Sequence, residues 1–413
     1  FPTRRSSDLW DDSVPLEATV GAGIRLGGLG RDPGLSHGAY EALSRHGSDE
    51  LKKKYLPKLT DGTWSGTMCL TEPQCGTDLG LIRTRAEPQA DGSHAITGTK
   101  IFISAGEHDL TENIIHLVLA RLPDAPGGTK GISLFVVPKF HVDEHGRPGA
   151  RNAVRCGSIE HKMGIHGNAT CVMNFDEASG YLISPPHKGM ACMFTFINES
   201  RMGVAQQALA QMEASHQTAL QYARERVQFR AAQRPNPEAA ADPIIQHPDV
   251  RRMLMRQKVL NEGMRAMALF TGHQLDLSVA HPDPEVREAA DDMVQLLTPV
   301  VKAFLTDEGF NNANVGLQVL GGSGFTTDWP LEQLVRDGRI PRIYEGTNGI
   351  QAMDLVGRKL GLKGGRLIGR LFDTITSFLA EHGDAPFHDE VASALQSLQE
   401  ATTWIATNGM QDP

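Results

Sequence analysis

A single acid, Glu345, stands in the stretch Arg342-Ile343-Tyr344-Glu345-Gly346-Thr347-Asn348-Gly349-Ile350-Gln351. It lies between an apolar approach and a Gly-Thr turn. A long segment with apolar residues at helical spacing comes just before, and it ends at the glycine-rich turn 321–324. Small residues around a carboxylate let it reach into a narrow pocket, so this pattern predicts that Glu345 is a base in an active site.

Composition limits the function classes. The 413 residues are enough for two or three domains, and 40% hydrophobic residues with 6% aromatics are typical of a globular protein. The formal net charge of −9 argues against nucleic acid as the main partner. No apolar run approaches the roughly 18 residues of a membrane span, so we expect no transmembrane segment. Five scattered cysteines without a CxxC pair favour a reducing, cytoplasmic location.

Both ends of the chain differ from the rest. Phe1–Leu9 reads like a translated sequencing adaptor, and we exclude it from the fold. The following segment, to about Pro33, is glycine-rich and weakly patterned. We therefore expect that the native N-terminus is missing and that the C-terminus is cut as well.

Periodicity divides the remaining chain into an α+β order. Residues 36–58 predict two short helices, the remnant of a helical domain over 10–64. Short apolar runs separated by turn residues predict a small sheet or β-barrel domain over 65–180. From Gly189 the spacing is helical, which predicts an antiparallel bundle over 188–365. The helices expected there and in a truncated extension over 366–413 are Met193–Arg226, His247–Val279, Pro284–Leu320, Gly346–Leu360, Leu367–Leu379 and Glu390–Ile405.

Two upstream motifs bear on a cofactor. The first is Met68-Cys69-Leu70-Thr71-Glu72-Pro73-Gln74-Cys75-Gly76-Thr77-Asp78, an apolar strand that ends in hydroxyl and turn residues. Alone it is more typical of an ordinary strand, turn and helix cap. The second, Lys100-Ile101-Phe102-Ile103-Ser104-Ala105-Gly106, follows after one hairpin. Together they predict a surface that holds the polar edge of a flat ring.

The paired motifs and the Glu345 stretch closely resemble those of the acyl-CoA dehydrogenases. The resemblance implies that FAD is the cofactor. Leu70, Thr71 and Thr77 would contact the flavin, and Phe102 and Ser104 would cover its other edge. Phe102 departs from the tryptophan usual in the family but keeps a flat apolar surface.

Further motifs carry the same resemblance. Asn198 and Arg201 would contact the CoA part of the substrate, together with Thr77 and Gly346, although Arg201 taken alone is more typical of a helix-surface cation. The resemblance implies further cofactor contacts, some of which would reach the FAD of a neighbouring subunit while others follow the base. They are Arg226, Phe229, Gln318, Gly321, Gly322, Thr347 and Asn348. A proline-rich loop before His247 departs from the family. The histidines show no metal-ligand spacing, so we expect no metal site.

The resemblance implies α,β-dehydrogenation of an acyl-CoA to a trans-2-enoyl-CoA, with Glu345 as the base. It is strongest for the larger bacterial members that carry an extra C-terminal helical region, which act on 3-methylmercaptopropionyl-CoA or on fatty acyl-CoAs. An electron-transfer flavoprotein as acceptor and a homodimer or homotetramer are implied as well. The alternatives are an oxidase that reacts with oxygen, a DNA-associated flavoprotein of the alkylation-response type, which the acidic balance disfavours, and an inactive fragment.

Overall fold

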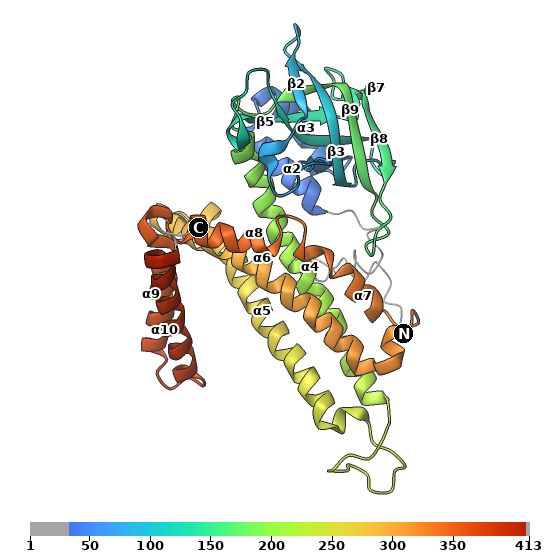
Figure 1. The fold of residues 1–413 in the computed structure, drawn as a ribbon, viewed down its shortest axis with the longest axis vertical. Coiled ribbons are helices and arrows are strands. Elements are labelled where there is room, and N and C mark those ends of the chain that lie inside the picture. The colour runs from blue at the N-terminus through green and yellow to red at the C-terminus, as the bar shows by residue number, and fades with distance from the viewer. Residues whose placement is uncertain (1–32, 410–413) are drawn as a thin grey trace. The chain divides into compact units, whose positions relative to one another are not determined.

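The computed structural model describes residues 33–409. The expected adaptor segment 1–9 and nearly all of the glycine-rich start lie outside the described residues, as do residues 410–413. The fold divides between Gly203 and Val204 into two compact units. The first contains two helices and a sheet, and the second is helical (Figure 1). Each unit is described by itself.

The first unit opens with the two predicted helices, α2 (Pro33–His46) and α3 (Asp49–Thr60). Ser48 caps α3 by accepting a hydrogen bond from the Leu51 backbone N–H at 3.3 Å. Asp49 and Glu50 in its first turn complement the positive end of the helix dipole. Leu51, Tyr55 and Leu59 form the buried face, at spacings of four residues.

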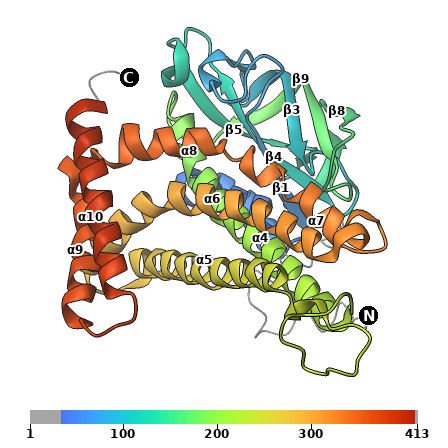
Figure 2. The ribbon, with the colours of Figure 1, turned by 60° about the horizontal axis from the view of Figure 1, so that its bottom comes forward.

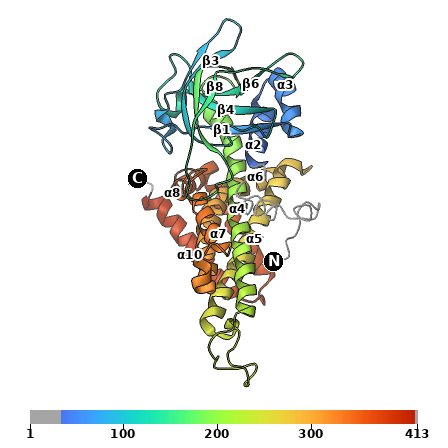
Figure 3. The same ribbon diagram turned by 90° about the vertical axis from the view of Figure 1, so that its right-hand side faces the viewer.

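Nine strands follow within the described residues, and seven of them form one mixed sheet that curls on itself (Figure 3). Pairings of β2 with β3, β3 with β9, β9 with β5, β5 with β4 and β4 with β2 close a ring of five strands. β1 pairs with β4, and β8 pairs with β9. The expected β-barrel is therefore confirmed. The strands are β1 (Trp64–Cys69), β2 (Arg85–Pro88), β3 (His94–Ser104), β4 (Asn113–Arg121), β5 (Ile132–Pro138), β6 (Phe140–Val142), β7 (Pro148–Arg151), β8 (Val154–Ile159) and β9 (Thr170–Leu182).

Strand β4 lies between two hydrophobic cores. It is apolar on both faces and buried over Asn113–Ala120. Val118 and Ala120 belong to the cluster that also holds Phe135 and Phe175. Side chains alternate along a strand, so Ile115, Leu117 and Leu119 join the other cluster, with α2, α3 and the start of α4. A strand with a core on each face is mostly apolar on both faces, as β4 is apart from the buried Asn113 and His116.

The second unit is built on long helices. α4 (Gly189–Glu225) begins in the first unit and continues into the second. α5 (Pro248–Ala280) and α6 (Pro284–Leu320) run side by side, as Figure 2 shows. Pro248 and Pro284 occupy the first helical positions, where a missing N–H costs nothing. The short α7 (Leu331–Asp337) and α8 (Asn348–Asp354) follow. The four predicted bundle segments are thus helical at their centres.

A helical hairpin ends the described chain. α9 (Arg366–Glu381) and α10 (His388–Trp404) correspond to the last two predicted helices. Asp292 on α6 is fully buried and accepts hydrogen bonds from three cations. These are Lys363 Nζ at 2.7 Å, Arg366 Nε at 2.7 Å and Arg370 Nε at 2.9 Å. This cluster holds α9 against α6. Among the residues the structure describes, no helix is long and apolar enough to cross a membrane.

Candidate active site

The two upstream motifs lie side by side in the first unit. The Ile101 backbone N–H donates to the carbonyl oxygen of Thr71 at 2.9 Å. Lys100 Nζ donates to the carbonyl oxygen of Leu70 at 3.0 Å. The segment that follows β1 is therefore bonded directly to β3. The structure brings together Leu70, Thr71, Phe102 and the neighbouring Ser104, which belong to motifs about 30 positions apart in the sequence.

Glu72 is a residue whose role the sequence reasoning missed. Its carboxylate is buried and accepts a hydrogen bond from Lys100 Nζ at 2.8 Å. It also accepts from Thr84 Oγ1 at 2.6 Å and from the Arg83 backbone N–H at 2.7 Å. Burial would raise the pKa of Glu72, but the Lys100 charge and these hydrogen bonds lower it to about 2. The signal was present, since Glu72 and Lys100 are opposite charges that each lie close to apolar residues in the two motifs.

Phe102 lies at an irregular point of β3. Its φ is 60°, in the left-handed region that non-glycine residues rarely adopt. The pairing of β3 with β9 shifts register between Lys100 and Ile103, which is a bulge at this point. The Phe102 side chain is 60% exposed. Thr77 is exposed too, and Ser104 is half-buried.

Asn198 and Arg201 lie one turn apart on α4. Arg201 is only 5% exposed, which excludes the helix-surface interpretation. Its Nη1 donates to Asn198 Oδ1 at 3.5 Å, and its guanidinium lies 5.9 Å from the centre of the Phe194 ring. Asn198 itself is exposed. The pair therefore forms one polar cluster, with the amide on its open side.

In the second unit, Glu345 lies in a tight turn between the 3₁₀ segment Ile340–Arg342 and α8. Its φ is 56° and that of Gly346 is 88°, so two successive residues are left-handed. The side chain of Glu345 is half-buried, and its Oε2 is shielded from solvent. Gln351 Nε2 donates to the carbonyl oxygens of Glu345 at 3.2 Å and of Gly346 at 3.1 Å. The acid is thus held in one backbone conformation.

The two residues predicted to contact FAD after the base begin α8. Thr347 is the N-cap, and its hydroxyl accepts from the Ile350 N–H at 3.4 Å. The amide of Asn348 faces α6. Its Oδ1 accepts from Lys302 Nζ at 2.8 Å, and its Nδ2 donates to Thr306 Oγ1 at 3.0 Å. Asn348 therefore also fastens this turn to α6, a role that the sequence did not indicate.

The other predicted cofactor residues of the second unit are exposed. Phe229 has a φ of 61° and is 78% exposed. It lines a cavity of about 330 Å³ with Gln228, Arg230, Ile244, His247 and Val250. Arg226 and Gln318 are exposed as well.

The glycine turn after α6 is open. Gly321 has a φ of 58°, which a glycine adopts without strain. A methyl group added to the α-carbon of Gly321 or of Gly322 would meet no atom within 4 Å. A phosphate could therefore approach this backbone closely.

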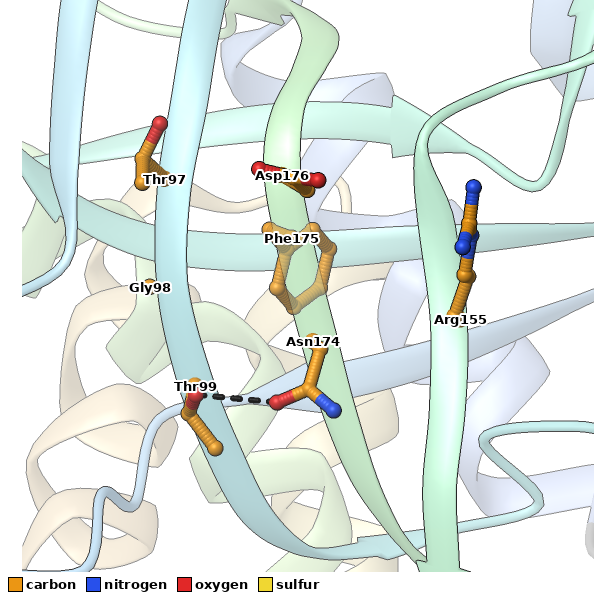
Figure 4. A pocket seen from close by; sticks show the side chains of 7 residues that line it. All are labelled: Thr97, Gly98, Thr99, Arg155, Asn174, Phe175 and Asp176. Carbon is orange, nitrogen blue, oxygen red and sulfur yellow. Dashed lines mark hydrogen bonds between the residues drawn. The ribbon is translucent and has the colours of Figure 1, made fainter.

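A second cavity, of about 390 Å³, lies in the first unit against the barrel strands (Figure 4). Its lining residues come from β3, β8 and β9 and are Thr97, Gly98, Thr99, Arg155, Asn174, Phe175 and Asp176. Thr99 Oγ1 donates to Asn174 Oδ1 at 2.9 Å across the two strands. This cavity contains none of the predicted site residues.

Within residues 33–409, no group of three His, Cys, Asp or Glu side chains could hold a metal ion.

The residues of each unit fit the groups of FAD. The first unit offers an exposed aromatic face, hydroxyls and a strand-end backbone, which suit a flat ring with a polar edge. The second offers an exposed arginine, an exposed aromatic ring and an open glycine turn, which suit a pyrophosphate and an adenine.

Family comparison matches residues 67–178 to the acyl-CoA dehydrogenase middle domain and residues 187–360 to the acyl-CoA dehydrogenase C-terminal domain. The chain belongs to the acyl-CoA dehydrogenase family. A 3-methylmercaptopropionyl-CoA dehydrogenase of Ruegeria pomeroyi is 49% identical over 349 residues, which are 84% of this chain and 59% of that protein. A butyryl-CoA dehydrogenase of Syntrophomonas wolfei is 41% identical over 392 residues, 91% of this chain and 64% of that protein.

The chain thus spans about three fifths of the length of these relatives. Among solved structures, Caenorhabditis elegans ACDH-11 in complex with C11-CoA has a TM-score of 0.81 at 23% identity. The match covers 98% of this chain and 68% of that one. At this identity the similarity shows the fold alone, and it confirms the α+β acyl-CoA dehydrogenase fold.

Proposed function

We propose that the protein oxidises an acyl-CoA thioester to the trans-2-enoyl-CoA, with Glu345 as the base. The observation that carries this proposal is the Glu345 turn. It holds a half-buried acid at a φ of 56°, with hydrogen bonds to its own carbonyl and to that of Gly346. Such backbone strain persists where the surrounding structure enforces it, and it is found most often at functional sites. Family membership supports the reaction class.

In this proposal the bond between the α-carbon and its hydrogen breaks, and the proton goes to the Glu345 carboxylate. The Glu345 backbone N–H donates to the thioester carbonyl and stabilises the negative charge that develops there. FAD, when held by the contacts proposed below, would supply the two-electron oxidising capacity that takes up the β-hydrogen as hydride. One proton and one hydride leave the substrate, and a carbon–carbon double bond forms.

The proposed cofactor contacts fall in both units. Leu70, Thr71, Thr77, Phe102 and Ser104 would bind the flavin from the first unit. The proposed contacts of the second unit are Arg226, Phe229, Gln318, Gly321, Gly322, Thr347 and Asn348. For the substrate we propose Thr77, Asn198, Arg201 and Gly346. The buried guanidinium of Arg201 supports this set because it holds the exposed Asn198 amide in place.

The proposed substrates are short acyl-CoAs, among them 3-methylmercaptopropionyl-CoA and butyryl-CoA. The identities of 49% and 41% to relatives named for these thioesters support this choice. We also propose that an electron-transfer flavoprotein accepts the electrons, that the protein forms a homo-oligomer and that it is located in the cytoplasm.

Anaerobic bleaching of bound flavin tests the proposal directly. The protein is loaded with FAD and mixed with acyl-CoAs from propionyl to palmitoyl and with 3-methylmercaptopropionyl-CoA. We expect the flavin absorbance to fall fastest with the short thioesters. Glu345→Gln is nearly isosteric but cannot accept the proton, so this variant should keep FAD and lose bleaching. Bleaching of the Gln variant at the wild-type rate would reject Glu345 as the base.

A further inference from the structure

Lys302 lies near the middle of α6, and its side chain is fully buried. Its Nζ donates to the carbonyl oxygen of Gly346 at 2.7 Å and to Asn348 Oδ1 at 2.8 Å. A lysine is seldom buried to this degree, because its ammonium group must be removed from water. Here the ammonium group binds the carbonyl of Gly346 and the side chain of Asn348, the two residues that flank Thr347 in the turn that carries Glu345.

This turn is strained. Left-handed backbone is unfavourable for a non-glycine residue, and Glu345 adopts it at a φ of 56°. The carbonyl of Gly346 accepts from both Lys302 Nζ and Gln351 Nε2, and the carbonyl of Glu345 accepts from Gln351 Nε2. Hydrogen bonds from a charged donor are about twice as strong as neutral ones. Lys302 and Gln351 therefore both donate to the backbone of this turn, and Lys302 does so from another helix, α6.

We propose that Lys302 is a positioning residue that fixes the direction in which Glu345 presents its carboxylate. This inference rests on the proposed function of Glu345 as the base. Lys302 acts through the Gly346 carbonyl and through Asn348, and not through contact with substrate. Without its ammonium group the turn can relax at Glu345, whose left-handed backbone is the strained one, and the carboxylate moves away from the α-carbon.

Lys302→Met tests this role because methionine retains a long apolar side chain and removes the donor. Activity is expressed per bound flavin, so that loss of folded protein is separated from loss of catalysis. We expect kcat to fall about 100-fold, the effect of a displacement near 1 Å, with KM changed less than about threefold. Exchange of the α-hydrogen of a bound acyl-CoA with deuterated water, which reports proton abstraction alone, should fall by the same factor.

Leu296→Ala is the matched control, because Leu296 lies on the same helix and is 1% exposed. It should lower the melting temperature and leave kcat per flavin unchanged. Gln351→Met removes the two neutral bonds and should give a smaller loss of kcat in the same direction, which keeps the test valid if Lys302→Met fails to fold.

Wild-type kcat and α-hydrogen exchange in Lys302→Met would overturn the inference. A loss confined to flavin content would also overturn it, since Lys302 would then contribute to stability only. A change confined to KM would overturn it as well, since proton abstraction would be unaffected. Glu345→Gln separates the two levels of the proposal. If that variant is inactive and Lys302→Met is normal, the positioning role fails and the base remains. If Glu345→Gln is active, the proposed function itself fails.

Discussion

Lys100 Nζ lies 2.8 Å from Glu72 Oε1, and the two side chains are 0% and 3% exposed. The pair joins the segment after β1 to strand β3, and Lys100 also binds the Leu70 carbonyl. Truncating one member of a buried ion pair leaves the other charge unpaired, which costs about 3–5 kcal/mol, whereas removing both costs less. We expect Lys100→Met to destabilise the protein by this amount and the double variant with Glu72→Gln to recover part of it. Urea denaturation of the four proteins measures the coupling, and simple additivity would contradict it.

The low pKa of Glu72 predicts a dependence of stability on pH. Its pKa is about 2 in the folded protein, against an ordinary value of 4.5, so the folded state favours the carboxylate. This contribution is present above about pH 4.5 and is lost as the pH falls toward 2, by up to about 3 kcal/mol. The difference in unfolding free energy between wild type and Glu72→Gln should therefore shrink between about pH 5 and pH 3. A constant difference would contradict the prediction.

Phe102 should show opposite effects on stability and on cofactor binding. Glycine adopts a positive φ without strain, so Phe102→Gly should stabilise the FAD-free protein by roughly 1 kcal/mol. The same change removes the exposed ring and should weaken FAD binding. Phe102→Leu is the control, because it keeps the strain and loses only the ring. Thermal unfolding and flavin titration measure the two effects. Undiminished FAD affinity in both variants would exclude Phe102 from the cofactor site.

The Asp292 cluster should hold the α9–α10 hairpin. Burial would raise the pKa of Asp292, but hydrogen bonds from Arg366 and Lys363 lower it, so the group is a carboxylate at neutral pH. Asp292→Asn removes its charge and leaves three cations close together. We expect faster amide hydrogen exchange throughout α9, with little change in α5. Arg370→Gln, which removes one partly exposed partner, should cost less than about 1 kcal/mol. Unchanged exchange in α9 would show that other contacts hold it.

The sequence predicted those features that depend on neighbouring residues. Apolar periodicity located α4, α5 and α6, and the short apolar runs located strands such as β4 and β5. The strand pairings that close the barrel could not be predicted in the same way, since β4 pairs with β2 and β5 pairs with β9, and neither pair is consecutive in the sequence. The single-residue bridge between Arg85 and Arg121 carries no sequence signal.

In the candidate site, too, the sequence indicated some residues, and others were revealed only by the structure. Motif spacing indicated Glu345 and the paired segments that contain Thr71 and Phe102. It did not indicate Lys302, because a lysine within a helix reads as a surface residue until its burial is known. Glu72 and Lys100 were visible as charges but not as a pair. Arg201 was open to two interpretations, and only its 5% exposure decides between them.

Closure of the five-strand ring leaves β8 as an edge. Over the described residues β8 is bonded only to β9, so its outer backbone groups resemble the template on which aggregates grow. Its sequence opposes this. The exposed Arg155 places a charge on the strand, and the register shift between Cys156 and Ser158 bends it. Replacing Arg155 with a β-branched apolar residue would favour pairing between the β8 edges of different molecules. The first sign would be lower solubility during expression.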